Sequence, residues 1–116
     1  MAIRRVQVGP RMSQAVIHGN TVYLAGQVAD RPVPSVGQQT KQILSRIDRL
    51  LKAAGSNKAK LISANIWMAD IRRFDEMNKV WDAWVSNGNA PARATVEAKL
   101  AGPDYLVEIM VTASLD

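Results

Sequence analysis

The sequence lacks cysteine altogether and contains a single histidine, His18. Without cysteine, the chain cannot form disulfides, thiolate metal sites or a cysteine nucleophile. One histidine excludes a histidine-based triad or a multi-histidine metal site unless subunits pool their residues. Any chemistry therefore has to use arginine, carboxylates, hydroxyls, backbone groups or water, and we expect no metal site. The absence of cysteine also fits a reducing compartment, and we expect a cytoplasmic protein.

Long apolar runs are also missing. No run approaches the roughly 20 residues that a membrane span needs. The first residues, MAIRRVQVGP, carry charges but no apolar signal-peptide core. We therefore expect no membrane association. The 116 residues are 47% hydrophobic and 22% charged, without repeats, which predicts one folded domain covering residues 1–116.

The net charge of +5 is spread over the whole chain. The only adjacent basic pairs are Arg4–Arg5 and Arg72–Arg73, and no basic run alternates with aromatic residues. This pattern favours an ordinary solvated surface over a nucleic-acid interface, so nucleic acid is not an expected partner.

The N-terminal part of the chain predicts strands. Residues 3–8 are followed by Gly9-Pro10, a turn signal. The β-prone segments 15–18 and 21–25 are joined by Gly19-Asn20, which is typical of a tight hairpin.

Two amphipathic helices are predicted. The first begins at Ser35, which forms a capping-box pattern with Gln38, and ends before Gly55, where glycine readily adopts the left-handed conformation. The second follows Asp70 as N-cap and stops at residues 87–89. Their apolar stripes comprise Val36, Ile43, Leu44, Ile47, Leu50, Leu51 and Ala54 in the first helix, and Phe74, Met77, Val80, Trp81, Trp84 and Val85 in the second.

Three further strands are predicted at residues 61–68, 92–97 and 105–113. In the first of these the even positions are all apolar, so Ile62, Ala64, Ile66 and Met68 are expected to face the helices. The element order is then β-β-β-α-β-α-β-β. The fold class is α+β: a two-layer domain with a mainly antiparallel β-sheet and two helices on one face.

Two helices can cover only one face of such a sheet, yet the last strand is apolar on both faces. One face carries Val107, Ile109, Val111 and Ala113. The other face carries Leu106, Met110 and Thr112, together with Glu108. An antiparallel sheet that faced water would show a polar face. The second face is therefore expected to be buried in a homo-oligomer.

Two charged residues stand out among small and apolar neighbours. Arg93 lies in PARATVEAKL, where its planar guanidinium could bind a ligand carboxylate or form a salt bridge with Glu97 or Glu108. Glu108 interrupts an apolar strand and could either hold a water for catalysis or pair with a basic residue. Local sequence leaves these alternatives open.

Four segments together resemble the Rid/YjgF (reactive intermediate deaminase) family. They are GPRMSQAV at residues 9–16, LAGQV at residues 24–28, the segment at residues 53–81, and PARATVEAKLAGPDYLVEIMVTA at residues 91–113. Each is weak alone, but their order and spacing span essentially the whole chain.

The resemblance implies a chorismate-mutase-like Rid fold and a homotrimer with ligand clefts between neighbouring subunits. It implies that Arg93 binds the substrate carboxylate and that Glu108 orients a water. This water would attack a 2-imino acid, or its 2-enamine tautomer, and give a 2-keto acid and ammonia without any cofactor. Backbone groups around Gly26 and Thr95 would complete the pocket.

The sequence departs from the family pattern at four pocket positions. Met12 replaces a tyrosine, Arg11 is inserted beside it, Ala25 replaces a serine, and Thr95 replaces a cysteine. Arg11 is a candidate for a second positive charge that favours a different or larger anion. The departures make a non-catalytic, carboxylate-binding or regulatory trimer the alternative function, with ribonuclease or RNA-binding activity less favoured.

Overall fold

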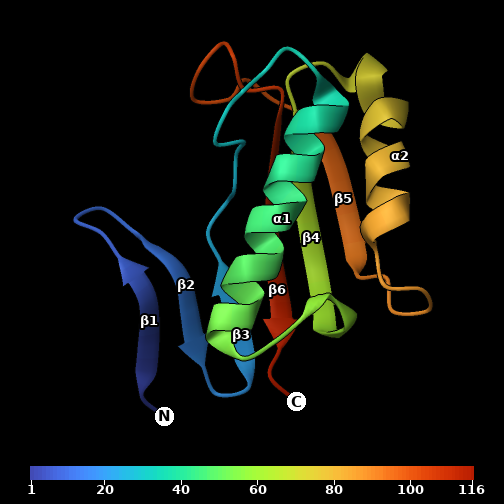
Figure 1. Cartoon of the computed structure of the whole chain (residues 1–116). Coiled ribbons are helices and arrows are strands. Elements are labelled where there is room, and N and C mark those ends of the chain that lie inside the picture. The colour runs from blue at the N-terminus through green and yellow to red at the C-terminus, as the bar shows by residue number, and fades with distance from the viewer.

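A six-stranded sheet carries two helices on one of its faces (Figure 1). The computed structural model describes all residues, 1–116. The strands lie in the order β1-β2-β3-β6-β4-β5, and only the pair β4 and β5 is parallel. The elements are β1 (Ile3–Val8), β2 (Ser13–His18), β3 (Thr21–Leu24), α1 (Val36–Ala54), η1 (Lys58–Lys60), β4 (Leu61–Met68), η2 (Ile71–Arg73), α2 (Phe74–Trp84), β5 (Ala92–Glu97) and β6 (Val107–Ser114).

The predicted α+β fold and element order are confirmed, with the short 3₁₀ turns η1 and η2 as additions. The tight hairpin is also confirmed, since β2 and β3 pair antiparallel from His18 opposite Thr21. The parallel pair β4 and β5 is joined through η2 and α2, because parallel strands need a crossover connection.

Helix α1 begins and ends where the sequence indicates. The Ser35 hydroxyl accepts a hydrogen bond from the backbone N–H of Gln38 at 3.2 Å, so Ser35 is the N-cap and Val36 the first helical residue. Gly55 has a φ of 91°, and its N–H donates to the carbonyls of Leu51 and Lys52. These contacts satisfy backbone groups that the helix itself leaves without partners.

Helix α2 is shorter and less deeply packed. Asp70 caps η2 rather than α2, because its side chain accepts from the backbone N–H of Arg72. Only Met77 and Trp81 of α2 are buried, whereas the other apolar residues of its stripe are partly exposed. One face of α2 therefore remains at the surface beside α1.

One hydrophobic core fills the space between the helices and the sheet. It is built from the inward faces of α1, β2, β3, β4 and β6 and from two residues of α2. The largest fully buried apolar side chains are Ile43, Leu44, Ile47, Leu51, Ile66, Met68, Met77 and Ile109.

The prediction for the first residue of the inward face of β4 was wrong. The pairing of β4 with β6 shifts register between Leu61 and Ser63. Leu61 is consequently buried, whereas Ile62 is 49% exposed. From Ala64 onward the predicted alternation holds, because Ile66 and Met68 are buried. A bulge of this kind changes which side chain faces the core without changing the apolar pattern of the sequence.

Strand β6 alternates as predicted but begins at Val107 rather than at residue 105. Leu106 lies in a loop, where its N–H donates to the Gln39 side chain at 2.9 Å and its carbonyl accepts from Ala69. Within the strand, every odd-numbered residue from Val107 to Ala113 is buried and every even-numbered one is partly exposed.

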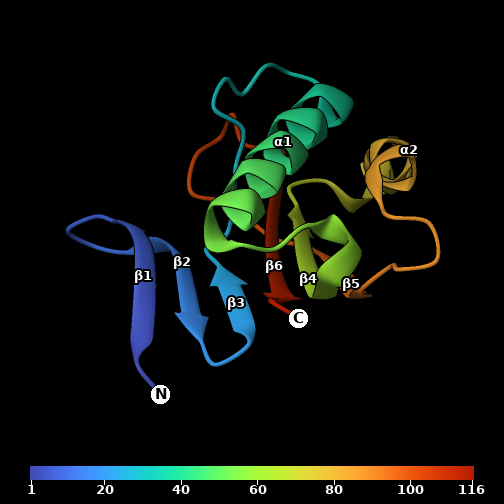
Figure 2. The same cartoon turned by 60° about the horizontal axis from the view of Figure 1, so that its bottom comes forward.

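Strand β1 projects beyond the helical layer at one edge of the sheet (Figure 2). All of its residues except Val6 are exposed, including Arg4 and Arg5. Gln7 has a left-handed backbone, with a φ of 51°. Neither helix is long and apolar enough to cross a membrane.

Replacing Gly37 or Gly55 of the α1 region by alanine should have opposite effects on the free energy of unfolding. Gly55→Ala should lower the free energy of unfolding by about 1 kcal/mol, because its φ is left-handed. Gly37→Ala should raise it by up to about 0.5–1 kcal/mol, because a Cβ there meets only Val80 at 3.7 Å and alanine favours helix. Urea unfolding followed by circular dichroism measures both, and equal effects would contradict the assignment of the helix end.

Candidate functional site

Arg93 lies on edge strand β5, on the helix side of the sheet. It is in register with buried Ala64 of β4, and neighbours on one rung point to the same face. One guanidinium N–H donates to the Asn78 side chain at 2.7 Å. The guanidinium carbon lies 5.7 Å from the centre of the Phe74 ring and 5.3 Å from that of Trp81. Helix α2 therefore holds the guanidinium through one hydrogen bond and two cation–π contacts.

No carboxylate neutralises Arg93. The salt-bridge alternative is wrong, because Arg93 forms no ion pair with Glu97 or Glu108. Glu97 instead accepts a hydrogen bond from the backbone N–H of Ile71 at 3.1 Å. In the single chain Arg93 is also exposed rather than enclosed by its small neighbours. Most of its donors are therefore available to an anion.

Thr95 lies two residues along β5, on the same face as Arg93. It is in register with buried Ile66. Its hydroxyl oxygen is buried and has no hydrogen-bond partner. Arg93 and Thr95 thus form the first group of predicted site residues that the structure brings together.

Glu108 lies on the opposite face of the sheet. It is in register with Trp67 of β4, whose other neighbour is Val96 of β5. The carboxylate forms no ion pair and no side-chain hydrogen bond, so the pairing alternative for Glu108 is also wrong. Its partial burial raises the pKa of the carboxyl above the usual glutamate value.

Gly26 makes room for this carboxylate. A Cβ at position 26 would collide with the Glu108 carboxylate, which therefore lies directly against the backbone of the chain. Ala25 precedes it and donates its N–H to the carbonyl of Gln14 at 2.9 Å, continuing the pairing of β2 with β3. The backbone at Ala25 and Gly26 and the Glu108 carboxylate together form the centre of a second group of predicted site residues.

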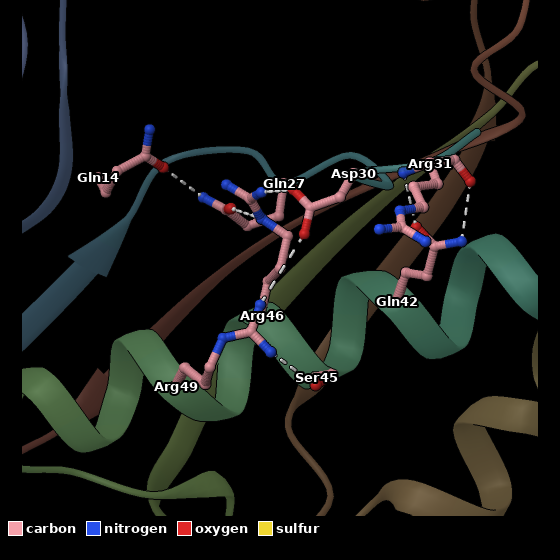
Figure 3. Close-up of polar contacts among 8 residues, drawn as sticks. All are labelled: Gln14, Gln27, Asp30, Arg31, Gln42, Ser45, Arg46 and Arg49. Carbon is pink, nitrogen blue, oxygen red and sulfur yellow. Dashed lines mark hydrogen bonds and ion pairs between the residues drawn. The ribbon is translucent and has the colours of Figure 1, made fainter.

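A network around Gln27 holds this backbone in place, and sequence analysis missed its role. The backbone N–H and carbonyl of Gln27 both pair with Ile109, at 2.8 and 3.1 Å. Its buried amide also donates to the Ala25 carbonyl at 2.9 Å. The same amide donates to Gln14 and accepts from Arg46, each at 2.9 Å, and Arg46 also pairs with Asp30 (Figure 3).

The loop that follows β3 is fixed to α1 in the same region. The Gln42 side chain accepts from the N–H of Arg31 and donates to its carbonyl, at 2.9 and 2.8 Å (Figure 3). Arg46 directly precedes the buried Ile47, so it lies at the margin of the buried stripe of α1. This position was the only sign in the sequence that Arg46 has a structural role. Helical periodicity cannot show that its partners are Gln27 and Asp30.

The remaining candidates lie at the turn before β2. The carbonyl of Met12 accepts from the N–H of Gly9 at 2.8 Å, and the Met12 side chain is 47% exposed. Arg11 is exposed and forms no ion pair. Because β2 runs beside β3, this turn lies near the end of β3 where Ala25 and Gly26 are found.

Within one chain the predicted site residues therefore form two groups on opposite faces of the sheet. Arg93 and Val111 flank the same residue of β4, Ala64, whereas Glu108 pairs with Trp67, three residues further along that strand. Two surface hollows, one between α1 and α2 and one at the end of β5 beside Asp70, are not lined by Arg93 or Glu108. No group of three or more metal-ligating side chains is present.

Comparison with known proteins identifies the family. The sequence model described as "Endoribonuclease L-PSP" matches residues 3–115. A RutC family protein of Haemophilus influenzae is 43% identical over 115 residues, covering 98% of this chain and 99% of the relative. The RutC family protein YoaB of Escherichia coli is 44% identical over 115 residues, covering 99% and 100%. The chain belongs to the Rid/YjgF family.

A solved structure of another YjgF-family protein, from Neisseria meningitidis, superposes with a TM-score of 0.97 at 43% identity. The match covers 100% of this chain and 97% of that one. The resemblance noted in the sequence is therefore confirmed, together with the fold that it implied. The roles of individual residues in this Rid/YjgF protein remain predictions.

The raised pKa of Glu108 predicts a pH-dependent effect on stability. A carboxyl whose pKa is raised by folding destabilises the folded state once pH exceeds its ordinary value. Glu108→Gln should therefore raise the unfolding temperature at pH 7.

Thermal unfolding followed by circular dichroism from about pH 4 to pH 8 tests this, and the gain should disappear at the acidic end. Asp104→Asn, which removes an exposed carboxylate, is the control. A gain that persists at low pH would contradict the assignment to the charge of Glu108.

Proposed function

We propose that this protein hydrolyses 2-imino acids, or their 2-enamine tautomers, to 2-keto acids and ammonia. The observation that carries the proposal is the guanidinium of Arg93, which helix α2 orients but no carboxylate of the chain neutralises. A planar guanidinium can donate two parallel hydrogen bonds to the two oxygens of a substrate carboxylate. Membership of the Rid/YjgF family supports the assignment.

We propose further that the active site forms between subunits of a homotrimer. Arg93 and Thr95 of one subunit would face Glu108, Gly26 and neighbouring backbone of the next. Two features support this: the two groups lie on opposite faces of one chain's sheet, and that chain leaves apolar side chains uncovered on the face away from the helices. Among these are Tyr23 at 47% exposure and Val96 at 51%.

In this site Arg93 binds the carboxylate and fixes the imine carbon, while Glu108 holds a water against it. The water oxygen bonds to the imine carbon as Glu108 accepts a water proton and passes it to the nitrogen. A second proton transfer, from the carbinol hydroxyl to nitrogen, lets the C–N bond break and releases ammonia. Imines react readily with water, so orientation supplies much of the catalysis. The raised pKa of Glu108 brings it closer to the value that suits a general base near neutral pH.

The positions at which the sequence departs from the family pattern determine which groups can transfer protons in the proposed site. Met12 and Ala25 bring no hydroxyl to the position of the family tyrosine and serine. Proton transfer then relies on Glu108 and water. A protein that binds 2-keto acids through Arg93 without accelerating imine decay would support the non-catalytic trimer instead.

Arg93→Ala should lower kcat/KM for imine hydrolysis by roughly 10²- to 10³-fold, because the substrate loses both its charge partner and its orientation. Arg93→Lys should retain part of the activity, since a lysine keeps the charge but not the two parallel donors. Imines generated by an amino-acid oxidase and trapped with semicarbazide measure the rate. Arg72→Ala, which removes an exposed arginine paired with Asp70, is the matched control. Full activity in Arg93→Ala would overturn the proposal.

Mixed oligomers test whether the two groups come from different subunits. Arg93→Ala and Glu108→Gln chains carrying different affinity tags are co-expressed, and oligomers that contain both are purified. Each homo-oligomer should be inactive, whereas every mixed trimer should carry one intact site in three, about a third of the wild-type number, since an interface needs both intact residues. Absence of any restored activity in verified mixed trimers would contradict the intersubunit site.

A further inference from the structure

A groove separates α1 from α2 on the outer surface of the molecule, where the two helices lie side by side over the sheet (Figure 2). Its volume is about 730 Å³, within the range of pockets for small molecules. The wall includes the N-cap of α1, Ser35, and the first-turn glycine, Gly37, as well as residues of α2. None of the residues proposed for the imine site lines it.

The floor of the groove is apolar and includes a fixed aromatic ring. Leu44 of α1 and Val80 and Ala83 of α2 line it together with Trp84. The indole N–H of Trp84 donates to the Asp48 carboxylate at 3.0 Å, which fixes the ring across the two helices. A flat apolar ligand could therefore pack on this floor without the entropic cost of first immobilising the Trp84 ring.

The charges around the groove are not balanced. Lys41, Lys58 and Lys79 line it, and none of them forms an ion pair. The two carboxylates of the groove already have partners: Asp48 binds the Trp84 indole, and Glu76 binds Arg73 at 3.0 Å.

Two further features add to the positive potential. Lys58 Nζ lies 5.4 Å from the centre of the Trp84 ring, which holds its charge at the apolar floor. The N-terminal turn of α1 contributes the positive end of a helix dipole at the other end of the groove. The groove therefore presents an apolar floor under an excess of positive charge.

From this combination we infer that the groove binds a small organic anion with a flat apolar body, at a second site separate from Arg93 and Glu108. The apolar body packs against Trp84, Val80 and Ala83, and the anionic group lies among the lysines. The size of the groove, its apolar floor and its three lysines without ion-pair partners favour this class of ligand over a cation or a neutral sugar.

The probe 8-anilinonaphthalene-1-sulfonate has this chemistry, and its fluorescence reports binding. The wild-type oligomer should bind it saturably with one site per chain, and affinity should fall as salt screens the lysines. The double substitution Lys41→Gln/Lys79→Gln should weaken binding roughly three- to tenfold, the range expected for two exposed charges. Ala83→Leu, which fills the groove, should weaken it at unchanged charge.

The matched control is Lys52→Gln/Lys99→Gln, which removes two exposed lysines outside the groove and should leave the affinity unchanged. Arg93→Ala should also leave it unchanged, because the imine site is elsewhere. Equal affinity for the uncharged analogue N-phenyl-1-naphthylamine would overturn the inference. So would no saturable binding, no effect of either groove variant, or loss of binding in Arg93→Ala.

Discussion

Side chains along a β-strand alternate between the two faces of a sheet, and this constraint governs the whole arrangement of the candidate site. It puts Arg93 beside the helices and Glu108 on the bare face, so neither residue can serve the other within one chain. The apolar side chains of that bare face give a physical reason for chains to associate. Assembly and catalysis are then linked, because the contact that buries the sheet would also bring Arg93 of one chain and Glu108 of the next together.

Helix α2 has a second organising role, because its two sides serve different surfaces. Phe74, Asn78 and Trp81 hold the guanidinium on one side, and Lys79 and Val80 line the groove on the other. Met77 and Trp81 fix the inner face of the helix in the core, so both surfaces share one support.

Patterned elements could be predicted from the sequence, whereas features set by tertiary partners could not. Ser35 and Gly55 marked α1 because capping chemistry is local, and the alternation of β6 indicated both of its faces. The bulge that buries Leu61 in place of Ile62 could not be predicted, because both residues are apolar. For the site, residue types were recognisable, but the Arg93–Asn78 contact and the separation from Glu108 depend on strand register.

The exposed strand β1 has a consequence for solubility. An edge strand offers unpaired backbone groups on which another chain can add by intermolecular pairing, the first step towards aggregates. Arg4 and Arg5 place positive charge along this edge, and the left-handed backbone at Gln7 interrupts its regular pleat. Like charges would meet if two such edges approached, so this exposed edge is protected against adding a second copy of itself.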